Sequence, residues 1–233
     1  RITEWLRLPA HAVDTYKVAQ WYIHDFGMRA SSVAEESEMF GRAHLLSFKG
    51  TDTFNAAYQA WRMGCNDDTG RSILALAHRI VQGYDKEIDC YINLMKADNI
   101  GSYVADCYNF KRAIADMIVP LAKQNPSKIF VSRPDSGDMS ENTRWVIEQT
   151  QKQETPNVSL IHGDSVKPLI SKEQIDIAWE MGVNPATFML FGVGGYGRNT
   201  ATRDALSASY KLSAIRKEEY SRWSPVVKLS DSI

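Results

Sequence analysis

The fold class follows from one stretch of the sequence, Ile129-Phe130-Val131-Ser132-Arg133-Pro134-Asp135-Ser136-Gly137. Its first four residues are typical of a short buried β-strand, and Pro134 and Gly137 then break the extended backbone. The same order recurs nearby: residues 102–105 lead to Asp106, 158–161 lead through His162 to Gly163-Asp164, and 188–191 lead to Gly192-Val193-Gly194-Gly195. The sequence therefore predicts several short strands, each ending in a polar or glycine-rich turn.

Helical patterns separate these strands. From residue 100 onward strand and helix alternate, with crossover lengths that suit parallel βαβ units. We expect strands at 44–48, 102–105, 128–132, 158–161, 188–191 and 225–229. We expect helices at about 10–22, 52–64, 79–97, 108–124, 140–152, 171–182 and 199–207. The pattern predicts an α/β fold with a parallel sheet, and no linker or internal repeat divides residues 1–233.

The residues that follow the strands predict a functional site. Parallel strands place their carboxyl ends at one edge of a sheet, where α/β proteins gather catalytic and ligand-binding groups. Asp106, Asp135 and Asp164 each follow a strand, beside Arg133 and a glycine turn. A single Asp or Gly often only starts a turn or caps a helix. Four successive strands with such endings instead favour one shared site.

The composition excludes several other classes of protein. The 233 residues are 44% hydrophobic and 24% charged, an ordinary globular balance that excludes fibrous and disordered classes. With 27 basic and 28 acidic side chains, the net charge of −1 predicts neither a nucleic-acid partner nor a membrane partner. The sequence lacks a transmembrane run, a secretory leader, a C-x-x-C pair and a zinc-binding histidine pattern, so we expect a cytoplasmic protein with reduced thiols.

The stretch Gly192–Gly197 satisfies the pattern G-x-G-x-x-G of dinucleotide-binding folds. Too few residues follow Gly197 to complete a doubly wound domain. A phosphate cradle late in a barrel is the better interpretation, in which backbone N–H groups approach an anion and Arg203 follows on the next helix. A plain turn from loop to helix would give the same pattern.

Five motifs, in order along the chain, carry a resemblance to a known family. They are residues 24–29 (His-Asp-Phe-Gly-Met-Arg), 48–53 (Phe-Lys-Gly-Thr-Asp-Thr), 133–137, 162–164 and 192–204. Together they resemble the nicotinamide phosphoribosyltransferases, which are type II phosphoribosyltransferases, over roughly residues 20–212. The resemblance implies an irregular (β/α) barrel that is incomplete at both ends, because family members continue before and after this segment. It also implies a homodimer at full length, with an aromatic residue from the partner completing each site.

The resemblance implies a reaction and a set of residues that perform it. Nicotinamide attacks phosphoribosyl pyrophosphate in the presence of Mg²⁺, giving nicotinamide mononucleotide and pyrophosphate. Phe26 would stack on the pyridine ring and Asp52 would accept a hydrogen bond from its carboxamide. The remaining substrate-binding positions are Arg29, His78 and Arg133 for pyrophosphate; Asp106, Asp135, Gly163 and Asp164 toward the ribose; Gly194, Gly195, Arg203, Ser209 and Lys211 for the 5′-phosphate; and Ser102, with no particular group of the substrate assigned to it. His78, Asp106 and Asp135 would be catalytic, and Mg²⁺ would lie at Asp106 and Asp135, directly or through water.

Some features of the sequence are compatible with more than one activity. The family can use ATP as an activator by phosphorylating the residue at His78, but Ala77 stands where a glutamate is usual, which argues against ATP coupling here. Residues 225–232 resemble the nicotinate enzyme, whereas Asp52 favours nicotinamide because a carboxylate repels an anionic ring substituent. The same residues would also suit a truncated, non-catalytic phosphoribosyl-binding domain or an unrelated barrel enzyme with a phosphate cradle.

Overall fold

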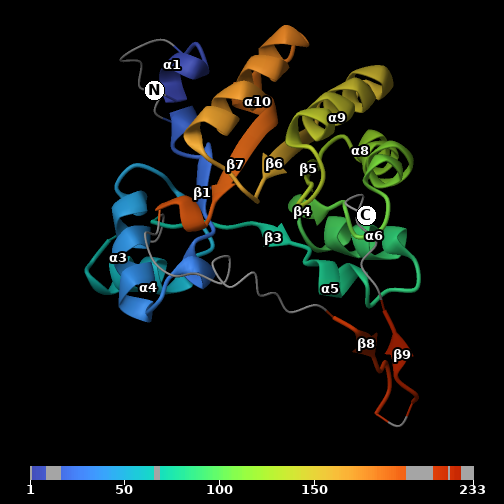
Figure 1. Ribbon diagram of the computed structural model, residues 1–233. Helices are drawn as coiled ribbons and strands as arrows, with labels where there is room; N and C mark the ends of the chain where they lie inside the picture. The colour runs from blue at the N-terminus through green and yellow to red at the C-terminus, as the bar shows by residue number, and fades with distance from the viewer. Residues whose placement is uncertain (1, 9–16, 66–68, 198–211, 220, 227–233) are drawn as a thin grey trace.

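The computed structural model describes residues 2–8, 17–65, 69–197, 212–219 and 221–226. Seven strands form one sheet in the order β2-β1-β7-β6-β5-β4-β3, and every neighbouring pair is parallel (Figure 1). Their bounds are β1 (Ile23–Asp25), β2 (Gly50–Thr51), β3 (Leu74–Ala75), β4 (Ile100–Val104), β5 (Ile129–Arg133), β6 (Val158–His162) and β7 (Met189–Val193). A separate antiparallel pair, β8 (Ala214–Ile215) and β9 (Ser224–Pro225), lies apart from this sheet.

The sheet curls until its two edges approach each other. Gly50 of β2 forms an isolated parallel bridge with Arg71, and the Thr51 N–H donates to the Arg71 carbonyl at 2.9 Å. A few residues later, Leu74 and Ala75 pair with β4 at the opposite edge. The segment from Arg71 to Ala75 therefore joins both edges, and the curled sheet with its helices is the irregular α/β barrel that the family resemblance implies.

Helices surround the curled sheet (Figure 1). Helices α3 (Ala34–Leu45) and α4 (Phe54–Arg62) pack together beside β2, α6 (Glu87–Ala97) packs on β4, and α9 (Met139–Gln153) packs on β6 and on α10 (Pro168–Glu180). Helix α9 begins where Asp138 accepts a hydrogen bond from the Glu141 N–H at 2.8 Å, and α10 begins at a proline that suits a first helical position. The other helical elements are α1 (Ile2–Trp5), η1 (Met28–Ala30), α5 (His78–Val81), α7 (Phe110–Arg112), η2 (Ala113–Ile118), α8 (Val119–Gln124), α11 (Pro185–Phe188) and η3 (Gly195–Gly197).

The hydrophobic core lies between the outer face of the sheet and these helices. Tyr103 of β4 stacks on Phe130 of β5 with ring centroids 5.0 Å apart, and Tyr91 of α6 meets Tyr103 edge-on. All three rings are buried. Because side chains alternate along a strand, the neighbours of these core residues face the inside of the curl. The core thereby fixes which residues can reach the interior.

The structure confirms four of the predicted strands, those that became β4, β5, β6 and β7, and the helices that became α4, α9 and α10. The strand expected at 44–48 is wrong: His44 and Leu45 end α3, and Leu46 is 82% exposed in the turn that follows. The helix expected at 79–97 is interrupted between α5 and α6, and the one at 108–124 contains a π-helical stretch, η2.

Other sequence predictions concern residues outside the described ranges. Residues 17–19 are helical, but 10–16, 199–207 and 227–229 are not described, so the predictions there stay predictions. Within the described ranges, no helix is both long enough and apolar enough to cross a bilayer.

Candidate active site

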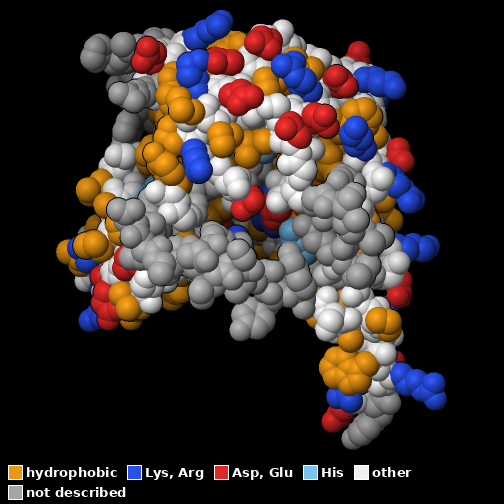
Figure 2. Space-filling model, viewed as in Figure 1, with side chains coloured by type: hydrophobic (Ala, Val, Ile, Leu, Met, Phe, Trp, Pro, Cys, Tyr) orange, Lys and Arg blue, Asp and Glu red, His pale blue; other side chains and the backbone are white. Residues whose placement is uncertain are grey.

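Every strand of the barrel is followed, within three residues of its carboxyl end, by a residue that the sequence assigns to the site. Phe26 follows β1, Asp52 follows β2 and His78 follows β3; the other strands lead to Asp106 (β4), Asp135 (β5), Gly163 and Asp164 (β6), and Gly194 and Gly195 (β7). Figure 2 shows acidic, basic and histidine side chains meeting at a hollow near the middle of the viewed face. The parallel sheet therefore brings residues that are far apart in the sequence together at one edge.

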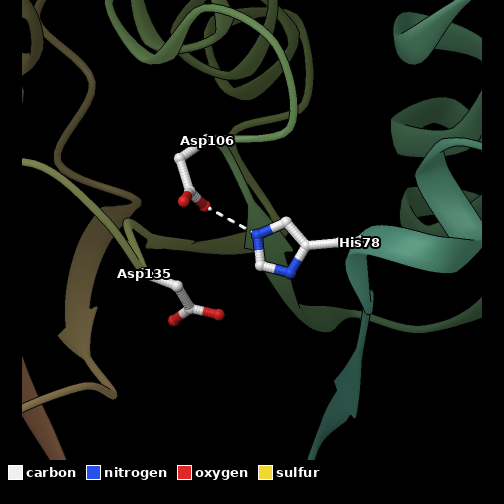
Figure 3. Close-up of side chains that lie close together, drawn as sticks. All are labelled: His78, Asp106 and Asp135. Carbon is white, nitrogen blue, oxygen red and sulfur yellow. Dashed lines mark hydrogen bonds and ion pairs between the residues drawn. The ribbon is translucent and has the colours of Figure 1, made fainter. Parts of the chain in front are cut away.

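His78 and Asp106 pair with each other at this edge, beside Asp135 (Figure 3). His78 Nε2 lies 3.0 Å from Asp106 Oδ1, and the other carboxylate oxygen accepts a hydrogen bond from the Ser136 hydroxyl. The Asp106 side chain is only 2% exposed, whereas that of His78 is 25% exposed. A buried carboxylate with both oxygens hydrogen-bonded is held in one orientation, with the more accessible imidazole beside it.

Arg133 and Asp135 lie beside this pair. The Arg133 guanidinium donates to the Leu76 carbonyl at 2.6 Å, and its Nε lies 3.3 Å from Asp135 Oδ1. That approach is an ion pair and not a hydrogen bond, so the buried Nε has no hydrogen-bond acceptor among the described residues. An anionic ligand at this position would find a donor already desolvated.

The cluster has the donors of a Mg²⁺ site. One ligating atom each from His78, Asp106 and Asp135 lies within 4.8 Å of the others. Mg²⁺ prefers oxygen ligands and is commonly held by one or two carboxylates together with water and substrate phosphates. The two carboxylates fit such a role, while the imidazole is better suited to donate a hydrogen bond to an anion.

Phe26 directly follows β1. Its N–H donates to the Val193 carbonyl at 2.9 Å, which extends the β1–β7 pairing by one residue. The next residue of the site, Asp52, is held beside β1 because its N–H donates to the Asp25 carbonyl, and its carboxylate accepts from the Ser72 hydroxyl. His24 lies nearby; burial lowers its pKa, and the Asp52 carboxylate opposes that effect. An aromatic ring, a carboxylate and a neutral imidazole therefore share this end of the barrel.

Ser102 of β4 is buried, and its hydroxyl has no hydrogen-bond partner among the described residues. Because Tyr103 packs in the outer core, Ser102 faces the interior, where a substrate could satisfy it. Arg29 on η1 and Asp164 are exposed, and Gly194 and Gly195 are half-buried after β7. The remaining predicted residues, Arg203, Ser209 and Lys211, lie outside the described residues.

The sequence analysis gave no role to three residues that the structure places at or beneath the site: Ser72, Ser136 and His162. Ser136 was visible only as part of the turn after β5, and Ser72 precedes a strand too short to predict. His162 ends β6; its ring is buried, stacks on Phe191 and has its Nε2 2.9 Å from the Thr143 hydroxyl, which donates to Gln174 at 2.7 Å. Burial lowers the pKa of His162 to about 3, so this histidine is a neutral structural support under the Gly163 turn.

These features define a class of protein: an α/β barrel whose carboxyl edge joins a carboxylate–histidine pair, an arginine and a glycine-rich turn. The profile of the nicotinate phosphoribosyltransferase (NAPRTase) family matches residues 21–233, and the chain belongs to that family. Two proteins described as nicotinamide phosphoribosyltransferase are similar in sequence. The one from Xanthomonas campestris is 28% identical over 214 residues, covering 83% of this chain and 46% of the relative; the one from Mycoplasma pneumoniae is 26% identical over 259 residues, covering 95% and 53%.

Solved structures agree with the fold. The nicotinate phosphoribosyltransferase from Porphyromonas gingivalis superposes with a TM-score of 0.67 at 16% identity, covering 93% of this chain and 55% of that one. The nicotinate phosphoribosyltransferase from Vibrio cholerae gives a TM-score of 0.62 at 15% identity, with coverages of 94% and 52%. The chain thus spans about half the length of the relatives that it matches.

Proposed function

We propose that this chain provides the catalytic barrel for phosphoribosyl transfer from phosphoribosyl pyrophosphate to nicotinamide, giving nicotinamide mononucleotide and pyrophosphate for NAD salvage. The observation that carries the proposal is the pairing of His78 with the buried Asp106, next to Arg133 and Asp135. This arrangement puts cationic or proton-bearing groups and carboxylates side by side. A reaction that separates a pyrophosphate anion from a ribosyl cation needs both.

The division of charge suggests how the reaction proceeds. As the bond from the anomeric carbon to pyrophosphate lengthens, the Asp106 and Asp135 carboxylates stabilise positive charge on the ribose. Arg133 Nε and His78, at the same edge, would donate to the departing pyrophosphate. The Asp106 and Asp135 carboxylates would also hold Mg²⁺, which when bound would supply further neutralisation of the leaving group's charge.

The base enters at the other side of the same edge. The Phe26 ring would stack on the pyridine, and Asp52 would accept a hydrogen bond from the carboxamide N–H. Nicotinamide is favoured over nicotinate because the Asp52 carboxylate repels a second carboxylate and the buried His24, with its lowered pKa, offers no compensating positive charge. The two sequence relatives described as nicotinamide enzymes agree with this choice, whereas the two structural neighbours are described as nicotinate enzymes.

Product identification tests the proposal. The chain, with any flanking segments its gene encodes, would be incubated with phosphoribosyl pyrophosphate, Mg²⁺ and either nicotinamide or nicotinate, and the nucleotide separated by chromatography. We expect nicotinamide mononucleotide, formed by a homodimer. Nicotinate mononucleotide alone would establish the nicotinate enzyme instead, and binding of phosphoribosyl pyrophosphate without either product would establish a non-catalytic domain.

A further inference from the structure

A row of glycines lies across the inner face of the barrel at the level of the base site. In the sheet register His24 of β1 pairs with Gly50 of β2 on one side and with Gly192 of β7 on the other. Gly163, directly after β6, continues the row toward Asp135. Barrel interiors are ordinarily filled by bulky side chains, so the three glycines leave room at this level for the rings of His24 and Phe26.

The glycines provide space rather than special backbone geometry. Neither Gly192 nor Gly163 has the positive φ that would itself require glycine. A Cβ built on Gly192 would instead lie 2.1 Å from Cε2 and 2.2 Å from Cδ2 of Phe26, far inside any real contact. At Gly163 the corresponding distance to Phe26 Cε2 is 3.4 Å, an ordinary van der Waals contact. The edge of the Phe26 ring therefore rests directly on the backbone of β7.

The ring has little freedom to move away from Gly192. Its backbone is fixed by the hydrogen bond to Val193, and the His24 ring, centred 6.3 Å away and tilted by 56°, limits displacement toward β2. The His24 ring in turn lies against Gly50, where a Cβ would meet Nδ1 at 2.4 Å. The rings of His24 and Phe26 thus both pack against the backbone of a glycine in a neighbouring strand, Gly50 and Gly192 respectively.

We propose that Gly192, which no sequence motif assigned to the base, is a positioning residue that sets the plane of the Phe26 ring for stacking on the pyridine. The inference rests on the proposed function. Any side chain at position 192 tilts or lifts the ring, so the pyridine loses its stacking surface, while the pyrophosphate cluster at His78, Asp106 and Arg133 keeps its geometry.

The test is a double-mutant cycle in the active protein. Gly192→Ala should raise KM for the pyridine base by at least about tenfold, as expected for a misfitted pocket, and change KM for phosphoribosyl pyrophosphate less than about twofold. In a Phe26→Ala background the same substitution should add no further rise, because the ring it displaces is absent. Gly101→Ala is the matched control. A Cβ at Gly101 would lie 2.9 Å from the Leu94 side chain, which is not part of the site, so the substitution should lower stability without changing the ratio of the two KM values.

Three results would overturn the inference, and the third is distinguishable from the first two. Equal rises in both KM values, or a persistent effect of Gly192→Ala without the Phe26 ring, would make Gly192 a structural residue while the proposed function stands. Absence of transfer to any pyridine base in the wild-type protein would remove the proposed function and the inference with it.

Discussion

The imidazole Nε2 of His78 lies 3.0 Å from Oδ1 of Asp106, although the two residues follow different strands at the edge of the sheet. Their pairing depends on the parallel neighbours β3 and β4, whose register places Ala75 opposite Ser102. The backbone ladder fixes the ends of both strands, and the Ser136 hydroxyl, from the turn after β5, holds the second oxygen of Asp106. Substitution of the pair and of the groups that surround it separates their contributions to activity and to stability.

Asp106→Asn should lower kcat/KM by about 10²–10³-fold, the usual cost of losing a preorganised electrostatic group. The amide keeps the shape and can still accept from Ser136, so the free energy of unfolding should change by no more than about 1 kcal/mol. Steady-state kinetics and urea denaturation measure the two effects. Asp176, a half-exposed carboxylate paired with Lys172 on α10, provides the control, and Asp176→Asn should change neither activity nor stability measurably. Unchanged activity of Asp106→Asn would exclude a catalytic role.

Ser136→Ala should remove the hydrogen bond to the second oxygen of Asp106 and lower the free energy of unfolding by about 1–3 kcal/mol, because the buried carboxylate loses a partner. Activity should fall less than in Asp106→Asn, since the charge remains. Ser171→Ala, which removes a hydroxyl bonded to its own helix, serves for comparison. Should Ser136→Ala inactivate the enzyme without any loss of stability, Ser136 itself would contact the substrate.

Asp52→Asn should shift the preference toward nicotinate by at least about tenfold in the ratio of kcat/KM values, because a like-charge contact costs several kcal/mol. The measurement is competition between the two bases in one reaction. Asp98→Asn, an exposed carboxylate beyond the end of α6, should leave the ratio unchanged. A ratio that also stays constant in Asp52→Asn would show that another group selects the base.

The buried His162 makes stability depend on pH. Its pKa is about 3 in the folded protein and near 6.5 in the unfolded chain, so only the unfolded chain binds a proton between these values. Stability from this group is therefore present above about pH 6.5 and is lost as the pH falls. Between about pH 7.5 and 5 the loss amounts to about 2 kcal/mol. Denaturant unfolding at these two pH values measures this loss. The wild type should lose about 2 kcal/mol more of its free energy of unfolding than His162→Gln does between the two pH values. Equal losses in the two proteins would contradict a neutral His162.

The carboxyl-edge residues were predictable because their signal is local. Each of the long strands β4 to β7 is an apolar run ending in Asp, Arg or Gly, and parallel topology then requires the endings to meet. The short strands gave no such signal. β2 and β3 have two residues each, too few for periodicity to register, and their pairing is set by the curl of the whole sheet.

The remaining errors have tertiary causes. The run from His44 to Phe48 has the composition of a strand, yet α3 extends into it because the helix packs on α4. The contacts of Ser136 and Gly192 depend on a carboxylate and an aromatic ring that are distant in sequence, so neither role was visible in a motif. Propensity and pattern predict elements; the packing between them determined these positions.

The most direct measurement of the central claim is pyrophosphate release from phosphoribosyl pyrophosphate, followed with and without added nicotinamide in the wild type and in Asp106→Asn. The account predicts release that depends on the base, equals the nicotinamide mononucleotide formed mole for mole, and falls by about two orders of magnitude or more in the variant. Pyrophosphate release that does not depend on nicotinamide, or that is equally fast in Asp106→Asn, would contradict a phosphoribosyl-transfer site at this edge of the barrel.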